Sequence, residues 1–250
     1  MKAILLAAGR GKRLKQLTER TPKPMLRVQG EIILEHNIQW LKRYGINEIF
    51  INLHYFSKVI PNYFGNGQKW GVNITYSYEE NLLGTAGAVR KIVKENPSIL
   101  NDGNFLVIYG DNFYPFHYNL KDFIDFHYSK SSLTSIGLYQ NKNEIKKSGV
   151  ALLDQNHLIV DFVEKPLAPR PKSNLGPATK TLLEKGLINT GIYLLNKRVL
   201  EFIPEGSSDF GKDIFPQLMK KKFSLYGFLF EGKLIPIDTV ELYKKVSQSK

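Results

Sequence analysis

The sequence predicts an α/β protein with a doubly wound, mostly parallel sheet and a small β-rich insertion in its second half. Three observations support this fold class. Strand-like and helix-like segments alternate up to about residue 140, glycine-rich or charged motifs directly follow several apolar strands, and short strands replace the alternation afterwards. Alternation at this spacing is typical of a parallel sheet with helices on both faces.

The elements of the first half follow from their hydrophobic patterns. Residues 3–8 are uniformly apolar, as in a strand that is buried on both faces. A helix over about 32–43 follows, because Ile33, Ile38 and Leu41 form an apolar stripe and Tyr44-Gly45 marks its end. The same patterns then predict strand 47–53, helix 57–64, strand 72–78, helix 85–95, strand 104–109, helix 119–129 and strand 133–139.

The second half has a different organisation. Short strands are predicted at 150–153 and 158–163, on either side of a turn. The segment 166–185 contains four prolines and little periodicity, so we expect a surface loop that orders when substrate binds. One helix over about 240–247 follows. We expect a single domain, 1–250, with a first half of about 1–140 and a second half of about 141–250.

Composition places the chain among ordinary globular proteins. Its 42% hydrophobic content supports a packed core, and it contains no cysteine, which excludes disulfides and thiolate zinc sites. No apolar run reaches about 18 residues, and the N-terminus leads directly into a strand without a signal-peptide core. We therefore expect no membrane association and a cytoplasmic location.

The formal charge of +12 raises the question of nucleic-acid binding. The lysines are spread along the chain, and they are not interleaved with aromatic residues in a known nucleic-acid-binding motif. Small anionic substrates explain the same bias, so we expect no nucleic acid as a partner. A homo-oligomer is compatible with the sequence but nothing in it requires one.

A glycine-rich cationic loop closes the first strand. Gly9 and Gly11 alternate with Arg10, Lys12 and Arg13, so backbone amides there can approach phosphate oxygens closely. The loop does not match G-x-x-x-x-G-K-[ST], and no third glycine completes the dinucleotide pattern. A strand followed by a plain glycine turn is the alternative interpretation.

Charged residues also follow later strands. Asp111 ends the strand that contains Phe105–Ile108, Glu164-Lys165 ends another, and Asp238 follows the apolar residues 234–237. In an open parallel sheet, ligands bind outside the carboxyl ends of the strands, so these residues can share one crevice. Lone aspartates after strands are otherwise common as turn residues or helix caps.

Two further segments stand out. Lys23 lies between two prolines, which predicts a stiff extended segment that projects its side chain; a solvated loop is the alternative. Glu79-Glu80 precede the run Leu83-Gly84-Thr85-Ala86-Gly87, which opens a helix; by itself this could be a helix start with Thr85 as the N-cap.

Taken in order, these motifs resemble the sugar-nucleotide pyrophosphorylase family of nucleotidyltransferases, whose signature runs L-A-A-G-x-G-T-R-L, a spacer, and P-K. The resemblance covers residues 1–247. The motif L-G-T-A-G is most similar to the corresponding motif of mannose- and heptose-1-phosphate guanylyltransferases. Lys12 stands where the family has Thr or Ser. The loop after Asp238 lacks the family's glycine and is about two residues short, so it must differ from that of the relatives.

The resemblance implies a Rossmann-like fold of the nucleotide-diphospho-sugar transferase type and a set of site residues. It makes Asp111 and Asp238 the ligands of Mg²⁺, an ion that takes one or two carboxylates plus phosphate oxygens and water. It makes Arg13, Lys23 and Asp111 catalytic. The implied nucleotide-binding residues are Leu6, Ala8, Gly9, Gly11, Lys12, Arg13, Lys23, Glu79, Gly84, Thr85 and Gly110. The implied sugar-phosphate-binding residues are Gly149, Glu164, Lys165, Asn189, Thr190 and Gly191.

The implied reaction joins an NTP and a sugar 1-phosphate into an NDP-sugar and releases pyrophosphate. GTP is our first expectation, because a carboxylate can accept hydrogen bonds from N1-H and the N2 amine of guanine. The resemblance to mannose and heptose enzymes implies a manno- or heptose-type sugar. Uridylyl or thymidylyl transfer to another sugar 1-phosphate, cytidylyl transfer to phosphocholine, and a catalytically degenerate regulatory subunit stay open as alternatives.

Overall fold

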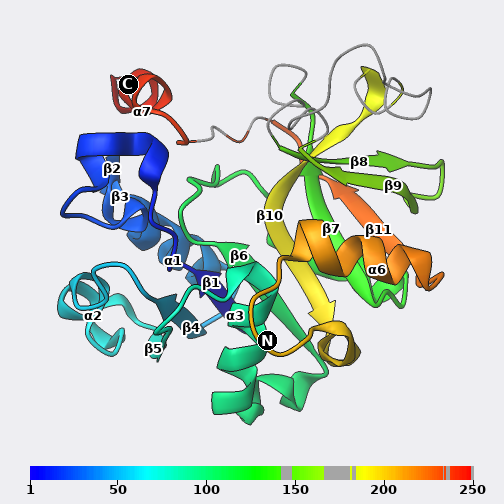
Figure 1. Cartoon of the computed structure of the whole chain (residues 1–250), viewed down its shortest axis with the longest axis horizontal. Coiled ribbons are helices and arrows are strands. Elements are labelled where there is room, and N and C mark those ends of the chain that lie inside the picture. The colour runs from blue at the N-terminus through cyan, green and yellow to red at the C-terminus, as the bar shows by residue number, and fades with distance from the viewer. Residues whose placement is uncertain (142–147, 166–180, 182–183, 233, 235–236, 249–250) are drawn as a thin grey trace.

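The computed structural model describes residues 1–141, 148–165, 181, 184–232, 234 and 237–248. One nine-stranded sheet runs through the molecule in the order β11-β7-β10-β6-β1-β4-β5, and β8 and β9 continue from β10 (Figure 1). Helices cover both of its faces. The predicted α/β class with a mostly parallel central sheet is confirmed.

The first half builds the parallel centre of the sheet. Strand β1 pairs in parallel with β4 and β6, and β4 pairs in parallel with β5. The elements of this half lie close to their predicted bounds: β1 (Lys2–Leu6), α1 (Ile33–Arg43), β4 (Glu48–Leu53), α2 (Val59–Phe64), β5 (Asn73–Tyr78), α3 (Gly84–Glu95), β6 (Asn104–Tyr109), α4 (Leu120–Ser129) and β7 (Thr134–Tyr139).

The second half contains the β-rich addition. Strands β8 and β9 form an antiparallel pair, and β8 also pairs with β10. The elements are β8 (Gly149–Leu153), β9 (Ile159–Glu164), β10 (Leu187–Asn196), α6 (Phe215–Lys220), β11 (Leu225–Leu229) and α7 (Val240–Gln248). The loop expected over 166–185 lies outside the described residues, except for positions 181, 184 and 185.

The position of β10 corrects one expectation. The sequence predicted that the parallel sheet extends through 133–139, but antiparallel β10 lies between β6 and β7. The parallel neighbour of β7 is β11 instead. Hydrophobic alternation identifies a strand but not its partner, and β10 comes from far along the chain, so local pattern could not reveal this pairing.

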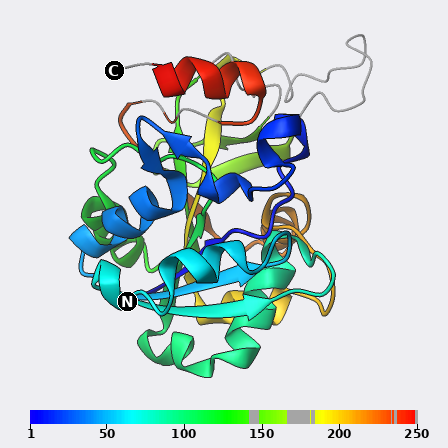
Figure 2. The ribbon, with the colours of Figure 1, turned by 90° about the vertical axis from the view of Figure 1, so that its left-hand side faces the viewer.

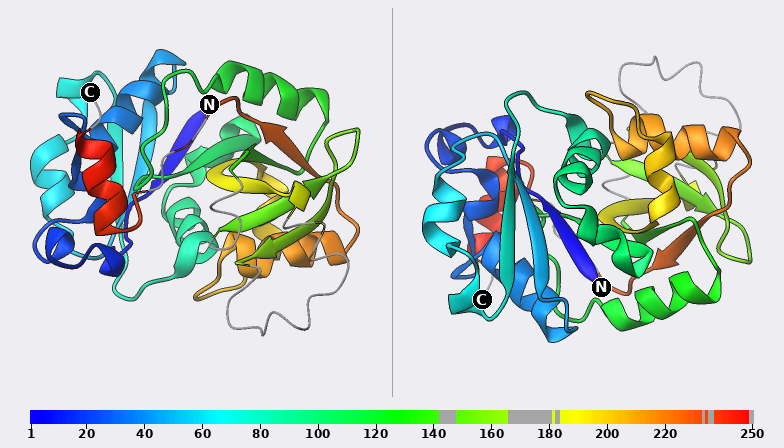
Figure 3. Two further views of the ribbon diagram at one scale, coloured as in Figure 1. Left: turned by 90° about the horizontal axis from the view of Figure 1, so that it is seen from above. Right: turned by 90° about the horizontal axis from the view of Figure 1, so that it is seen from below.

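The strands are buried on both faces, and this explains their continuous apolar sequences. In β1, Ala3 and Leu5 pack on the face covered by α1, α2 and α4, whereas Ile4 packs on the face covered by α3 and α6. Figure 3 shows α4 and α6 on opposite sides of the sheet. Two cores therefore hold the sheet as one rigid frame.

Short elements connect the strands to the site. They are the 3₁₀ helices η1 (Lys12–Thr18), η2 (Lys23–Met25), η3 (Gln68–Trp70), η4 (Pro97–Asp102) and η6 (Lys197–Phe202), the π-helical turn η7 (Phe210–Ile214), and the hairpin of β2 (Arg27–Val28) and β3 (Glu31–Ile32). Helix α7 packs over this hairpin and η1 (Figure 2). Its Val246 joins Leu14, Val28 and Ile237 in a third, smaller core. None of the helices in the described ranges is both long and apolar enough to cross a bilayer.

Candidate active site

The candidate site lies where the parallel strands end. The chain leaves β1 at Ala7, β4 ends beside Asn52, β5 leads to Glu79, and β6 leads to Asp111. Since these four strands are parallel neighbours, their carboxyl ends open on one edge of the sheet. Two pockets lie there, and Asp111 lines both of them.

The first pocket, which we call the cationic pocket, encloses about 270 Å³. Its lining residues are Arg10, Gly11, Lys12, Arg13, Leu14, Lys23, Asp111 and Asp238. Gly11 adopts a left-handed conformation (φ +59°), and a Cβ there would stand 3.2 Å from Lys23 Cβ. The glycine therefore lets the loop turn tightly against the segment that carries Lys23.

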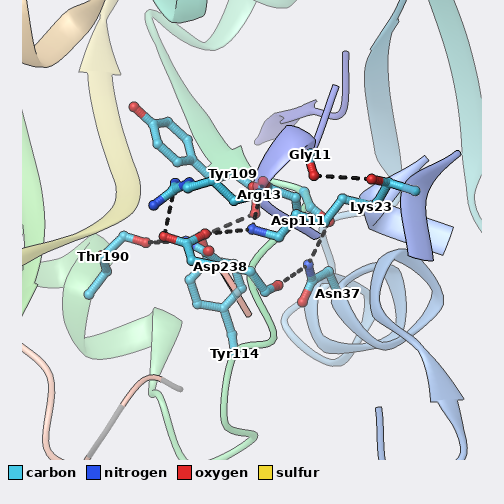
Figure 4. Close-up of polar contacts among 12 residues, drawn as sticks. Gly11, Arg13, Lys23, Asn37, Tyr109, Asp111, Tyr114, Thr190 and Asp238 are labelled. Carbon is cyan, nitrogen blue, oxygen red and sulfur yellow. Dashed lines mark hydrogen bonds and ion pairs between the residues drawn. The ribbon is translucent and has the colours of Figure 1, made fainter. Parts of the chain in front are cut away.

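Lys23 is the centre of an ion-pair network (Figure 4). Its Nζ lies 3.0 Å from Asp111 Oδ2 and 2.9 Å from Asp238 Oδ1. Arg13 reaches the other oxygen of Asp238 at 3.1 Å. The Lys23 side chain is only 5% exposed, whereas those of Asp111 and Asp238 are 33% and 35% exposed. The two carboxylates therefore keep a face open to the pocket.

The segment around Lys23 differs from its prediction. Pro22 is extended, as expected, but Lys23 begins the 3₁₀ turn η2, and its side chain is buried instead of projecting outward. The turn is closed by the Met25 amide, which donates to the Pro22 carbonyl at 2.8 Å. Attraction by two carboxylates compensates for the burial of the ammonium group.

The charges of this network stabilise one another. Burial would lower the pKa of Lys23, but Asp111 and Asp238 outweigh it and raise that pKa. Burial would raise the pKa of Asp238, but Lys23 and Arg13 hold it below its ordinary value, with a further contribution from Lys165. Lys23 and Asp238 are therefore both charged at neutral pH, and Lys165 faces the same site.

The second pocket, which we call the strand-end pocket, encloses about 250 Å³. Its lining residues are Leu6, Ala8, Gly9, Asn52, Glu79, Leu82, Gly84, Thr85, Tyr109, Asp111 and Asp209. Seven of these, namely Leu6, Ala8, Gly9, Glu79, Gly84, Thr85 and Asp111, were predicted site residues. The structure thus brings segments from distant parts of the sequence around one opening.

Glu79 lines this pocket and is only 1% exposed. Its Oε1 accepts a hydrogen bond from Asn52 Nδ2 at 2.6 Å, and its Oε2 accepts one from the Leu83 amide at 2.9 Å. Asn52 in turn accepts a hydrogen bond from the Ala7 amide at 2.6 Å. Asn52 therefore links the first glycine loop to Glu79, a role that its position inside a strand did not reveal.

The glycines of the L-G-T-A-G run have a packing role in addition to the nucleotide binding expected of Gly84. A Cβ on Gly84 would stand 2.5 Å from the Ser208 carbonyl oxygen, and one on Gly87 would clash with the Gly206 carbonyl. The Ala86 amide donates to the Ser208 carbonyl at 2.9 Å. These glycines therefore let the start of α3 pack against the backbone of a later segment.

Asp209 is a residue that the sequence reasoning missed. Its Oδ1 accepts hydrogen bonds from the Thr85 amide (3.1 Å) and hydroxyl (3.2 Å), so Asp209 caps α3, and Thr85 is not the N-cap. Thr85 also accepts a hydrogen bond from the Phe210 amide. The available signal was the polar run Ser207-Ser208-Asp209 beside Gly211.

The predicted sugar-side residues gather beside Asp209. A Cβ on Gly149 or on Gly211 would stand 2.6 Å from Glu164 Oε2, so the glutamate lies between these two glycines. Burial raises the pKa of Glu164, and the nearby Asp209 adds to the shift. Lys165 has a left-handed backbone (φ 50°), and its Nζ lies 3.9 Å from Glu164 Oε1.

A chain of hydrogen bonds joins Asn189, one of the residues predicted to bind the sugar phosphate, to Tyr109 of the strand-end pocket. Asn189 Nδ2 donates to the Tyr193 hydroxyl at 2.7 Å, which donates to the Tyr109 hydroxyl at 3.1 Å. Gly191 (φ +78°) is required here, because a Cβ would stand 2.6 Å from the Tyr109 ring.

Two predicted residues use their polar groups inside the fold. The Thr190 hydroxyl donates to the Gly137 carbonyl, and the Gly110 amide donates to the Leu6 carbonyl.

Within the described ranges, no group of three or more His, Asp or Glu side chains could hold a metal. Asp111 and Asp238 nevertheless offer carboxylate oxygens to one opening, where both now contact the same cation, Lys23. Mg²⁺ commonly has one or two carboxylates as its protein ligands, while phosphate oxygens and water complete its coordination. The residues therefore fit a magnesium ion that arrives with a phosphorylated substrate.

The fold and site together define a class: an α/β protein with a glycine loop, buried cations and paired carboxylates at the ends of its parallel strands. Comparison with known proteins identifies the family. The model for nucleotidyl transferases matches residues 2–236, and the chain belongs to this family.

Relatives agree with this membership. The chain is 32% identical to a UTP–glucose-1-phosphate uridylyltransferase of Synechocystis sp., over 97% of this chain but 61% of the relative. It is 31% identical to D-glycero-alpha-D-manno-heptose 1-phosphate guanylyltransferase of Campylobacter jejuni, over 97% of both chains. It thus spans about three fifths of some curated relatives and nearly all of others.

A solved structure gives the same result. HddC from Yersinia pseudotuberculosis, crystallised in complex with GMP-PN, superposes with a TM-score of 0.75 at 25% identity, over 99% of this chain and 98% of that one. The resemblance and the Rossmann-like fold type predicted from the sequence are confirmed. The curated relatives are sugar-1-phosphate nucleotidyltransferases.

Proposed function

We propose that this protein transfers a guanylyl group from GTP to a manno- or heptose-type sugar 1-phosphate, with Mg²⁺ as cofactor. The observation that carries this proposal is the buried Lys23, held between Asp111 and Asp238 beside a pocket that Glu79 lines. A cation of fixed position and two carboxylates suit two polyanionic substrates. The first half then binds the nucleotide, and the second half binds the sugar.

The reaction requires little covalent chemistry from the protein. A phosphate oxygen of the sugar 1-phosphate attacks the α-phosphorus of GTP, the bond to the β-phosphate breaks, and pyrophosphate leaves with the electron pair. Lys23 and Arg13 compensate the charge that develops on the phosphates, and the amides of Gly9 and Gly11 hold the phosphate chain in place. Because these groups are fixed beforehand, positioning supplies most of the rate enhancement.

Magnesium, when bound by Asp111 and Asp238, would supply charge compensation and orientation of the phosphates. Lys23 contributes in another way. It holds the two carboxylates close together before substrate arrives, since it neutralises part of their mutual repulsion. The site is thereby ready to accept a divalent cation together with the nucleotide.

The choice of guanine rests on Glu79. Its two oxygens already accept hydrogen bonds from Asn52 and Leu83, and each carboxylate oxygen has a second lone pair that can accept another. A carboxylate has no proton to donate to the O4 of uracil when ionised, whereas guanine offers N1-H and N2-H donors. The relative from C. jejuni is a guanylyltransferase, and HddC was crystallised with GMP-PN.

The sugar phosphate is assigned to the second half. Lys165 would bind its phosphate, and Glu164 would accept hydrogen bonds from sugar hydroxyls, with Asn189 beside it. Asp209 extends this set, because it lies next to Glu164 and lines the strand-end pocket. Two carboxylates side by side suit adjacent hydroxyls of a sugar ring.

The decisive experiment is a panel of the nucleoside triphosphates against several sugar 1-phosphates and phosphocholine, with and without Mg²⁺, followed by pyrophosphate release. We expect turnover with GTP and a manno- or heptose-type sugar 1-phosphate, and only with Mg²⁺. Preference for UTP and glucose 1-phosphate would overturn the substrate assignment. Binding without turnover across the panel would overturn the enzymatic one.

Glu79→Gln tests base recognition directly. The amide would present a donor where guanine also has donors, so kcat/KM for GTP relative to UTP should fall about 10-fold to 100-fold, as expected for a well-formed base contact. Glu80→Gln is the matched control, because Glu80 precedes the same loop but is exposed. An unchanged GTP-to-UTP ratio in Glu79→Gln would remove Glu79 from base recognition.

A further inference from the structure

Helix α1 holds the segment that follows Asp111 through side chains that donate to backbone carbonyls. Three side chains of the helix and that of its C-cap, Tyr44, make these bonds. They run from His36 to Tyr114, from Asn37 to Gly110 and Asn112, and from Trp40 and Tyr44 to Tyr118. The donors recur at the spacing of one helix face. The segment 110–118 thus rests on α1 along its length, and Figure 4 shows Asn37 beside the ion-pair network.

Asn37 makes the contacts nearest to Asp111. Its Nδ2 donates to the Asn112 carbonyl at 2.8 Å and to the Gly110 carbonyl at 3.4 Å, so it bonds the backbone of the residue before the aspartate and of the residue after it. Asn37 is 0% exposed. In the part of the chain that the structure describes, its Oδ1 has no hydrogen-bond partner. A buried acceptor without a partner costs free energy, so the benefit of this amide lies in its two donors.

The same helix is tied to the segment of Lys23. The chain enters α1 through the Ile33 amide, which donates to the Leu26 carbonyl at 3.0 Å, and Leu26 in turn donates to the Lys23 carbonyl at 3.1 Å. Helix α1 therefore contacts, through backbone or side-chain bonds, the segments of both partners in the Lys23–Asp111 ion pair. The distance between that ammonium and that carboxylate depends on one rigid element.

We propose that Asn37 is a positioning residue that fixes the Asp111 carboxylate for the divalent cation and for Lys23. This inference rests on the proposed function, in which Asp111 is a metal ligand. Groups behind a metal ligand orient it, and their loss typically lowers metal affinity or activity by about 10-fold to 100-fold. Asn37 acts through the backbone of Asp111 and does not touch substrate.

Two variants separate the donors from the bulk of the side chain. Asn37→Asp keeps the shape but directs an oxygen, in place of the amide nitrogen, at two carbonyl oxygens. Asn37→Ala removes both hydrogen bonds without adding repulsion. Tyr44→Phe is the matched control, because it removes one bond (3.3 Å) between the C-cap of the same helix and the far end of the same segment, at Tyr118.

The first readout does not depend on turnover. Binding of Mn²⁺ in the presence of a non-hydrolysable GTP analogue is followed by the loss of the free-ion EPR signal. We expect the apparent Kd of Mn²⁺ to rise at least about 10-fold in Asn37→Asp and about 3-fold or more in Asn37→Ala, with no change in Tyr44→Phe. Thermal unfolding of each variant shows whether the protein is folded.

The second readout is the Mg²⁺ dependence of pyrophosphate release by the folded variants. Half-saturating Mg²⁺ should rise in the same order, while KM for the sugar 1-phosphate stays near that of the unmodified protein. Equal metal affinity in Asn37→Ala and Tyr44→Phe would overturn the inference. If Asn37→Asp does not fold, the comparison of Asn37→Ala with Tyr44→Phe alone tests the role of Asn37. Absence of turnover in the unmodified protein would instead overturn the proposed function, and the EPR comparison would still decide the role of Asn37.

Discussion

At the scale of single residues, Lys23 determines the electrostatics of the site. Its ammonium group is nearly enclosed, yet its pKa is raised because Asp111 and Asp238 outweigh the effect of burial. Together, one ammonium group and two carboxylates have a net charge of minus one, which suits the divalent cation and the phosphates of the proposed function. Arg13, more exposed, adds a positive charge at the rim.

Replacement of Lys23 by Met tests this arrangement. Methionine fills a similar volume but leaves two carboxylates without their shared cation, so kcat/KM should fall about 100-fold to 1000-fold, the size seen when one transition-state donor is removed. The measurement is steady-state pyrophosphate release at saturating Mg²⁺. Lys121→Met, an exposed lysine paired with Asp125 on α4, should keep full activity. Activity of Lys23→Met within threefold of the unmodified protein would contradict a catalytic role.

The sequence predicted much of this site, partly from topology and partly from the family resemblance. Arg13 and Asp111 follow strands whose carboxyl ends a parallel sheet brings together, whereas Lys23 was assigned to the site by the resemblance. Asp238 was placed despite its altered loop, and the structure shows why: the chain goes from Asp238 almost directly into α7, and the carboxylate still reaches Lys23. Asn52, Asp209 and Asn37 could not be predicted, because their roles depend on contacts between distant segments.

At the scale of elements, the start of α3 and the segment 206–209 form one close-packed seam. Gly84 and Gly87 have no side chains because backbone carbonyls of Ser208 and Gly206 occupy that space. The sequence located α3 correctly, since its apolar stripe is local. It could not reveal the seam, because residues 206–209 are more than a hundred positions away. The same limit explains why antiparallel β10 was missed between β6 and β7.

Gly87→Ala and Gly9→Ala distinguish packing from binding. Alanine normally favours a helix, but a Cβ on Gly87 would meet the Gly206 carbonyl, so the free energy of unfolding should fall by about 1–3 kcal/mol. A Cβ on Gly9 would have no atom within 4 Å, so stability should stay unchanged while KM for the nucleotide rises. Urea denaturation and initial rates measure the two effects. A destabilised Gly9→Ala, or a fully stable Gly87→Ala, would contradict this division.

At the scale of the whole molecule, stability should depend on pH through a buried histidine in the frame of the sheet. His127 of α4 is 2% exposed. Its Nε2 donates to Asn104 Oδ1 (3.3 Å) at the start of β6, and its Nδ1 accepts a hydrogen bond from the Ser135 hydroxyl (2.9 Å) of β7. Asn104 Oδ1 also accepts a hydrogen bond from Asn196 of β10. The neutral imidazole thus contacts a junction of three neighbouring strands.

Burial lowers the pKa of His127 to about 4, against about 6.5 for an exposed histidine. Between these values the unfolded chain binds a proton that the folded protein excludes. The contribution of His127 to stability is therefore complete above pH 6.5 and is lost as the pH falls toward 4, by up to about 3 kcal/mol. Asp238, whose pKa is also lowered, destabilises the fold in the same direction but below about pH 4, the ordinary range of a carboxyl group.

The test is the free energy of unfolding between pH 7 and pH 4.5, compared for the unmodified protein and His127→Gln. Glutamine can donate to Asn104 and accept from Ser135 but does not titrate, so the variant should lose the steep part of the pH dependence in this window. The difference in stability between the two proteins should therefore shrink as the pH falls. Parallel curves for the two proteins would show that another group governs acid stability, and that protonation of His127 does not weaken the junction of β6, β10 and β7.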